Sequence, residues 1–173
     1  MDFQGLLSLP AGLHVRPATS SDQPFLNKLY KSTRDDLNWV DDEEDFIVHL
    51  KETQQEAQTE SYEDNFPNAM FFIIEYYHER AGRIILDFGP NEIRVVDISL
   101  ITEARGKGLG TAVMQSFVHC AEKVRVPLKL CVLSQNMGAK HVYAKLGFIL
   151  EEEIPPRDFL AYYPSSQGIR VGT

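Results

Sequence analysis

The stretch of this chain best suited to chemistry combines alternating glycines with two cations. It reads Arg105-Gly106-Lys107-Gly108-Leu109-Gly110. Glycine lets the backbone turn so that successive N–H groups point to one side, where they bind an anion. The apolar run at 93–101 predicts a strand before this stretch, and the pattern at 109–124 predicts a helix after it. A strand, a glycine loop and a helix start together predict a phosphate site.

The spacing excludes two common phosphate loops. Counted from Gly106 and Gly108, Thr111 occupies the position at which G-x-G-x-x-G needs its third glycine. No G-x-x-x-x-G-K-[ST] occurs in the chain. The remaining pattern is R-G-x-G-x-G at the start of a helix. Taken by itself, it is equally compatible with a glycine-rich turn that carries a solvated Arg105 and Lys107.

Length and composition favour one globular domain. The chain has 173 residues, of which 43% are apolar. We expect a single domain over 1–173, with a core at 13–163, a lead-in at 1–12 and a tail at 164–173. No apolar run approaches the roughly 20 residues of a membrane span, and the start of the chain has no cationic signal-peptide region. We expect Cys120 and Cys131 to be small buried hydrophobes in a reducing compartment, which favours the cytoplasm.

Charge and histidine spacing limit the ligands. The formal net charge is −8, which argues against nucleic acid as a partner. The five histidines show no ligand spacing with each other or with the cysteines, so we expect no metal site. An acidic run at 41–45 precedes a predicted second helix that carries Phe46, Ile47, Leu50 and Ala57. It either stabilises the helix N-terminus or forms an acidic rim for a cationic amine.

The elements around the glycine loop follow from periodicity and turn residues. A first strand at 13–18 precedes a helix with an apolar stripe at Phe25, Leu26, Leu29 and Tyr30. Strands are then expected at 69–77, 83–88 and 93–101, with turns at 78–82 and 89–92 between them. After the helix at 109–124, further strands are expected at 128–133, 148–153 and 159–163, and a short helix at 137–146. Because a helix connects 93–101 to 128–133, we expect those two strands to be parallel.

Two motifs in this order resemble the GCN5-related N-acetyltransferase family. The first is the coenzyme A pyrophosphate loop, [QR]-x-x-G-x-[GA], which Arg105, Gly108 and Gly110 match. The second is Asn-x-x-Ala-x-x-x-Tyr-x-x-x-Gly-Phe, which begins at Asn136 and runs through Ala139, Tyr143, Gly147 and Phe148. The resemblance is strong after Ile93 and rests on element order before it. It implies an α/β (α+β) fold with a mixed, mostly antiparallel central sheet of six to seven strands and helices on both faces.

The resemblance also implies a cofactor site. The backbone of Leu100, Ile101 and Thr102 should pair with the pantetheine arm as an added strand would. The pyrophosphate should meet the N–H groups of the loop, which comprises Arg105, Gly106, Lys107, Gly108, Leu109, Gly110 and Thr111. Asn136 should lie near the pantetheine between the two parallel strands, although it fits an ordinary helix cap equally well.

Two residues are candidates for proton transfer. By resemblance, Tyr143 is the general acid that protonates the leaving thiolate, whereas helical periodicity alone favours a core tyrosine. Asp97 lies within an apolar strand and is either a satisfied buried carboxylate or a base with a raised pKa that acts through water. Ser99 shares its face of the strand and would assist it, and Glu103 is expected at the surface.

The expected activity is transfer of an acetyl group from acetyl-CoA to a primary amine, by direct attack in a ternary complex and without a metal. The acceptor is a small amine or a protein. One alternative is a non-catalytic domain that binds or senses acyl-CoA, and another is a nucleotide-phosphate enzyme. No membrane partner is expected, and a homodimer through a sheet edge or the C-terminal tail is one compatible assembly that no specific residue supports.

Overall fold

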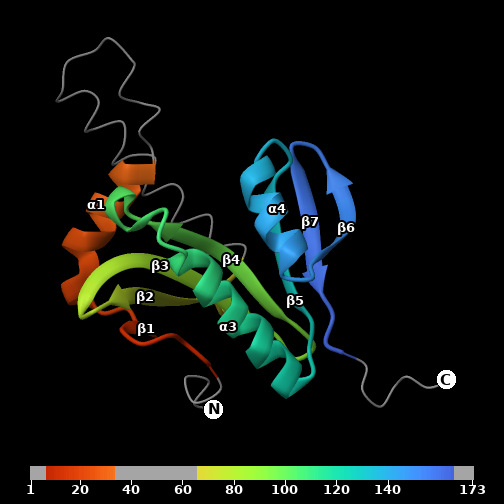
Figure 1. The fold of residues 1–173 in the computed structure, drawn as a ribbon, viewed down its shortest axis with the longest axis horizontal. Helices are drawn as coiled ribbons and strands as arrows, with labels where there is room; N and C mark the ends of the chain where they lie inside the picture. Colours follow the sequence, from red (N-terminus) through yellow and green to blue (C-terminus); the bar gives the residue numbers. More distant parts are fainter. Residues whose placement is uncertain (1–6, 34–65, 166–173) are drawn as a thin grey trace, which may run out of the picture. The chain divides into compact units, whose positions relative to one another are not determined.

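The computed structural model describes residues 7–33 and 66–165. These residues form seven strands, three α-helices and two short 3-10 helices (Figure 1). In chain order the elements are β1 (Leu13–Pro17), η2 (Ser20–Asp22), α1 (Gln23–Thr33), β2 (Met70–Tyr76), β3 (Glu79–Phe88), β4 (Ile93–Leu100), η4 (Thr102–Ala104), α3 (Leu109–Val124), β5 (Leu128–Leu133), α4 (Met137–Lys145), β6 (Ile149–Ile154) and β7 (Arg157–Tyr162). The acidic run at 41–45 and the predicted helix after it, which carries Phe46 and Ala57, lie outside the described residues.

The strands form one mixed sheet in the order β1-β2-β3-β4-β5-β7-β6. β4 and β5 are parallel, and α3 connects them along the chain. The pairs β1/β2, β2/β3, β5/β7 and β6/β7 are antiparallel. The predicted fold class and the predicted parallel pair are therefore confirmed.

The chain divides into two compact units. We call the described part of one, residues 10–33, 66–87 and 96–110, the glycine-loop unit. The described part of the other, residues 7–9, 88–95 and 111–165, is the α4 unit. Both units draw on separated stretches of sequence, and the extent of a single domain over 1–173 stays a prediction.

Two strands form the core of the glycine-loop unit. Residues 72–74 of β2 and 84–86 of β3 have no exposed surface, which is the pattern of strands covered on both faces. Asp22 is a buried carboxylate in the same unit. Its two oxygens accept a bidentate pair from Arg16 at 2.8 and 2.9 Å, and Oδ1 accepts from Arg80 Nε at 2.7 Å. The Arg16 guanidinium, more than any other partner, holds the pKa of Asp22 far below its usual range.

The turn between β2 and β3 is tighter than the sequence predicts. The turn was expected at 78–82, but β3 begins at Glu79, so the boundary prediction was wrong. Tyr77 and His78 both have positive φ, 48° and 70°, and this pair of left-handed residues matches the twist of a two-residue hairpin. Gly82 consequently lies inside β3. A Cβ at Gly82 would stand 2.2 Å from the Ser99 carbonyl oxygen, so the glycine permits close backbone approach there.

The α4 unit contains the buried face of α3. The helical pattern at 109–124 rests on five apolar residues, of which Val113, Phe117, Cys120 and Ala121 are buried and Val124 is half-buried. Burial raises the pKa of the Cys120 thiol. Cys131 is exposed, so its predicted burial was wrong. Cys131 stands opposite Phe159 of β7, and alternate β5 residues such as Leu130 and Val132 take the buried face instead.

Candidate functional site

The glycine loop has the backbone conformation that an anion site requires. Gly106 and Gly108 have φ of 76° and 78°, a region that other residues rarely adopt. No described atom lies within 4 Å of where a Cβ would stand on either glycine, so the loop surface is open there. α3 begins at Leu109, and the first N–H groups of a helix have no partner within the helix. The loop therefore presents unpaired N–H donors and the positive end of a helix dipole.

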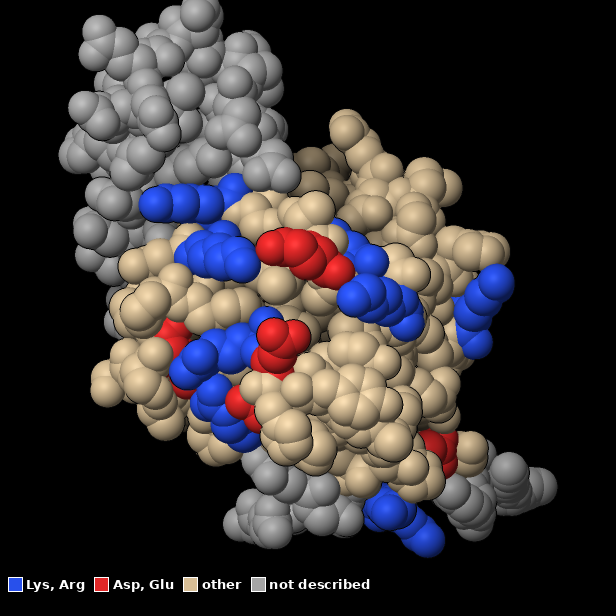
Figure 2. All heavy atoms as spheres, turned by 60° about the vertical axis from the view of Figure 1, so that its left-hand side comes forward, with Lys and Arg blue, Asp and Glu red and all other residues tan. Residues whose placement is uncertain are grey.

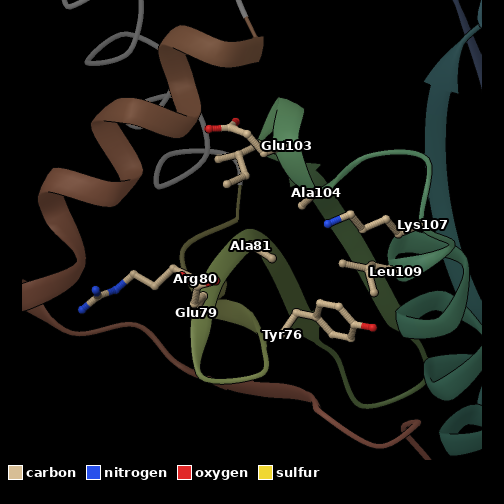
Figure 3. Close-up of a pocket in the computed structure, with 9 residues that line it drawn as sticks. Tyr76, Glu79, Arg80, Ala81, Glu103, Ala104, Lys107 and Leu109 are labelled. Carbon is tan, nitrogen blue, oxygen red and sulfur yellow. The ribbon is translucent and has the colours of Figure 1, made fainter.

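The two loop cations differ in role. Arg105 turns back onto its own loop, where its Nε donates to the Leu100 carbonyl oxygen at 3.0 Å and its Nη2 to Ser32 Oγ at 3.5 Å. Lys107 has an exposed side chain that lines a hollow beside the loop (Figure 3). Arg105 therefore braces the loop backbone, and Lys107 is an exposed positive charge beside the hollow.

The hollow has a volume of about 100 Å³. Its lining residues include Tyr76, Glu79 and Arg80 from the β2–β3 hairpin, and Figure 3 shows Lys107 and Leu109 across from Tyr76. Glu103 at its rim is exposed, as expected, and pairs with Lys28 of α1 at 3.3 Å. The Glu103 backbone N–H, followed by the Lys28 ammonium, lowers the pKa of the Glu103 carboxyl.

Positive charge gathers on one face of the molecule. Figure 2 brings forward the side of α1 and shows more Lys and Arg than Asp and Glu among the described residues. The chain as a whole carries a net charge of −8.

The segment predicted to face pantetheine already makes several hydrogen bonds. The Ile101 N–H donates to the Ala81 carbonyl oxygen of β3 at 2.9 Å. The Thr102 N–H donates to Ser32 Oγ at 3.1 Å, and the hydroxyls of Ser32 and Thr102 are 2.7 Å apart. Ser32 therefore ties the end of α1 to the loop that follows β4.

Asp97 forms an ion pair on β4. Its Oδ2 accepts from Arg83 Nη2 at 2.6 Å and from Ser99 Oγ at 3.0 Å. Of the two alternatives, the satisfied carboxylate describes these contacts, and Ser99 shares the face as expected. No described residue donates to the other oxygen, Oδ1, while Arg83 Nε is buried without a hydrogen-bond partner among the described residues.

Asn136 and Tyr143 both lie in the α4 unit. Asn136 is exposed and caps α4, since its side-chain oxygen accepts from the Ala139 N–H at 3.1 Å. Tyr143 is half-buried, and its ring packs against Phe148 with a centroid separation of 5.6 Å. The C-cap Gly147 has φ of 101°, and a Cβ there would stand 3.0 Å from the Tyr162 ring. Each residue of the second motif therefore has a structural task that fits its type.

The described residues hold no group of three or more His, Cys, Asp or Glu that could bind a metal ion. Likewise, none of the helices among them is long and apolar enough to cross a membrane.

The order of elements and the loop geometry match a known family. The profile of the acetyltransferase (GNAT) family matches residues 26–148, which include the glycine loop and the whole second motif. The chain belongs to this family. The prediction of an acetyl-CoA-dependent N-acetyltransferase is thereby confirmed, and acetyl-CoA is the co-substrate.

Solved structures of N-acetyltransferases share the fold. PaiA N-acetyltransferase from Thermoplasma acidophilum, in complex with coenzyme A, is 17% identical with a TM-score of 0.62, and the match covers 87% of this chain and 98% of that one. RimL, a ribosomal alpha-N-protein acetyltransferase in complex with coenzyme A, is 17% identical with a TM-score of 0.65 and coverage of 93% and 99%. Spermidine N-acetyltransferase from Vibrio cholerae, in complex with coenzyme A and spermine, is 17% identical with a TM-score of 0.63 and coverage of 90% and 98%. No curated protein sequence matches the acetyltransferase.

Sequence reasoning missed two partners in the glycine-loop unit. Arg83 was detectable in principle, because a cation on the neighbouring strand is the usual partner of a carboxylate in an apolar run. Ser32 had no signal, since a serine near the end of a helix is common and its contact with Thr102 spans 70 residues of sequence.

Proposed function

We propose that this acetyltransferase binds acetyl-CoA at the glycine loop and transfers the acetyl group to a primary amine that attacks the thioester directly. The observation that carries the proposal is the left-handed conformation of Gly106 and Gly108 immediately before α3. This backbone supplies N–H donors to a pyrophosphate without a Walker lysine or a dinucleotide fingerprint.

The cofactor contacts follow from the loop geometry. The Arg105 N–H already donates to Thr102 O at 3.2 Å, so the donors for the pyrophosphate are the N–H groups from Gly106 to Thr111. The pantetheine arm lies along Leu100, Ile101 and Thr102, where two N–H groups are engaged by Ala81 and Ser32. The amides of pantetheine therefore use the remaining groups of this segment or displace Ser32. Asn136 is a further candidate contact for the cofactor, by its match to the first position of the second motif.

Tyr143 acts as the general acid. Attack of the amine breaks the carbon–sulfur bond of the tetrahedral intermediate, and the phenol donates its proton to the departing thiolate. Support comes from its position in the second motif and from its half-buried ring, which rests on Phe148 and leaves part of the side chain accessible. Tyr143→Phe should lower kcat about a hundredfold and leave the affinity for acetyl-CoA unchanged.

Asp97 is the base, and it acts through water. A primary amine is mostly protonated at neutral pH and must lose a proton before it attacks. Arg83 and Ser99 both bind Oδ2, so Oδ1 is the oxygen that accepts hydrogen bonds from a water chain. A backbone N–H near Ser99 or Leu100 stabilises the oxyanion.

The acceptor is a cationic primary amine, either small or at a protein terminus or side chain. The similar structures include one enzyme described as a spermidine acetyltransferase and one described as a ribosomal alpha-N-protein acetyltransferase, which support both classes. Two free thiols, one of them exposed, favour the reducing cytoplasm. Nucleic acid and membranes are not partners in this proposal.

A homodimer through β6 completes the proposal. β6 ends the sheet order, and all six of its residues are exposed. Sedimentation at two protein concentrations tests the assembly.

Thermal unfolding with acetyl-CoA, ATP and NAD tests the cofactor. A ligand that binds only the folded state raises Tm, so a shift with acetyl-CoA alone supports the proposal. A shift with ATP or NAD instead would indicate a nucleotide-phosphate enzyme. Thiol release from acetyl-CoA is then measured with a panel of amines, for wild type and Tyr143→Phe. Binding without thiol release for any amine would favour the acyl-CoA sensor.

A further inference from the structure

A buried carboxylate joins three segments of the α4 unit. Asp158 of β7 is 1% exposed. Its Oδ1 accepts from Ser134 Oγ at 2.6 Å, and its Oδ2 accepts from Lys140 Nζ at 2.7 Å. Ser134 lies in the turn after β5, and Lys140 lies in α4. Hydrogen bonds from Lys140 first, and then from Ser134, lower the pKa of Asp158.

The same turn leads to Asn136. The Ser134 N–H donates to the Pro156 carbonyl oxygen at 2.8 Å, and the Asn136 N–H donates to the Leu133 carbonyl oxygen at 2.9 Å. Lys140 closes the arrangement, because its Nζ also donates to the Ser134 carbonyl oxygen at 3.3 Å. The path from β5 to the first turn of α4 is therefore fixed by side chains as well as by the backbone.

The other end of α4 rests on aromatic rings. The Phe148 ring contacts Tyr143 at a centroid distance of 5.6 Å and Tyr162 at 6.0 Å. The Tyr162 hydroxyl in turn donates to Glu122 of α3. With an ion pair at one end and tilted ring contacts at the other, α4 has little freedom to rotate about its axis within its unit.

The ion pair is partly buried, because the Asp158 side chain is 1% exposed and the Lys140 side chain is 28% exposed. Taking charges out of water carries a free-energy penalty, and apolar residues of similar size often stabilise a fold as well or better. The ion pair provides a defined geometry, because a carboxylate with two short hydrogen bonds accepts its partners in few orientations. A defined geometry matters most where side chains of the same helix must meet a substrate.

We propose that the cluster of Asp158, Lys140 and Ser134 positions α4 for catalysis, by fixing the helix rotation that presents Asn136 and Tyr143. The inference rests on the proposed function, in which Tyr143 protonates the thiolate. Asp158, Lys140 and Ser134 are positioning residues, since they act through Asn136 and Tyr143.

The test compares kcat and KM for Lys140→Met with a stability-matched control. Lys140 is the best residue to change, because its side chain is 28% exposed and its methylene stem is retained as Met. Ile85→Ala and Ile85→Val remove buried methyl groups from β3 and supply controls with a range of Tm losses. Lys140→Arg keeps the cation and serves as the conservative rescue, and Ser134→Ala is a second, milder variant of the cluster.

We expect Lys140→Met to lower kcat about tenfold or more, because small displacements of a catalytic group have effects of this size. The KM for the amine should stay within about twofold. The Ile85 control of equal Tm should retain its kcat, and Lys140→Arg should recover most of the wild-type rate. In a Tyr143→Phe background, Lys140→Met should cause no further loss, since two residues that act as one unit are not additive.

Two results would overturn the inference alone while wild type is active. One is equal loss of kcat in Lys140→Met and its Ile85 control. The other is a full additional loss in the Tyr143→Phe background. If the wild-type protein transferred no acetyl group, the proposed function would be refuted instead. The wild-type assay comes before the variants, so the two kinds of failure are distinguished.

Discussion

The three loop glycines give different predictions when each is changed to alanine. Gly106 and Gly108 are left-handed, with φ of 76° and 78°, whereas Gly110 lies in the first turn of α3. A left-handed alanine costs about 1–2 kcal/mol. For a chain of this size, 1 kcal/mol shifts Tm by roughly 2–4 °C, so we expect Gly108→Ala to lower Tm by about 2–8 °C.

Gly110→Ala should have the opposite effect on stability. A Cβ at Gly110 would stand 3.6 Å from Leu100 Cδ1, which is an ordinary contact. Alanine is a better helix former than glycine by up to about 1 kcal/mol, so Tm should rise by roughly 1–4 °C. The family pattern accepts glycine or alanine at this position, so coenzyme A binding should be retained. Gly110→Ala is thus the matched control for Gly108→Ala.

Binding separates the variants more sharply than stability does. A hydrogen bond to a charged group contributes about 1.5–3 kcal/mol, so one misdirected N–H weakens binding by about tenfold to a hundredfold or more. At a ligand concentration of 100 Kd, wild type gains about 2.7 kcal/mol of stability, and a variant with hundredfold weaker binding gains only about 0.4 kcal/mol.

The assay is thermal unfolding of each variant with and without coenzyme A at that fixed concentration. Gly108→Ala should lose about half of the shift or more, and Gly110→Ala should keep it. Gly106 also has a left-handed backbone, but the family pattern requires no glycine at this position. The coenzyme A shift of Gly106→Ala should therefore lie between those of Gly108→Ala and Gly110→Ala. A full coenzyme A shift in folded Gly108→Ala would refute the assignment of the loop as the pyrophosphate site.

Three further predictions concern the glycine-loop unit. Gly82→Ala should destabilise the fold by about 3 kcal/mol, because its Cβ would meet the Ser99 carbonyl oxygen at 2.2 Å. The control Gly89→Ala, whose Cβ would have its nearest neighbour at 3.4 Å, should be nearly neutral. Urea unfolding measures the stability of both variants, and equal stabilities would contradict the close approach at Gly82. The pKa of Asp22 is depressed in the folded state by Arg16, so its contribution to stability is present above the unfolded pKa of about 3.9 and is lost as pH falls below it. Asp22→Asn should therefore be less stable than wild type at pH 7, and the difference should shrink on acidification; a difference that is constant with pH would refute the ion pair. Arg105→Ala should weaken coenzyme A binding equally at low and high salt, because Arg105 braces the Leu100 carbonyl. Lys107→Ala should weaken binding at low salt and have less effect at high salt, because Lys107 acts as an exposed charge that salt screens. Calorimetry at two salt concentrations distinguishes them, and an Arg105→Ala effect that vanishes at high salt would contradict the brace.

Local pattern predicted the elements that surround the loop. The helix at 109–124 and the strand at 128–133 match α3 and β5 at both ends, because each has a clear apolar period and a turn residue at its boundary. Asn136 was recognised as a possible helix cap from residue type alone, since capping depends on the immediate neighbours of the backbone, and it is the N-cap of α4. The order of two short motifs was sufficient to indicate the family.

The sequence by itself thus determined the family, the order of elements and the glycine loop, all of which depend on residues close together in the chain. Only the tertiary structure decided the contacts between distant residues. Arg83 with Asp97, Ser32 with Thr102, and Lys140 with Asp158 are side-chain partners brought together by strand register and helix placement. The start of β3 at Glu79 depended on a left-handed pair, Tyr77 and His78, which carry no glycine to mark the turn. Such features depend on which face of an element a residue occupies and on what lies opposite it, and a linear pattern does not contain that information.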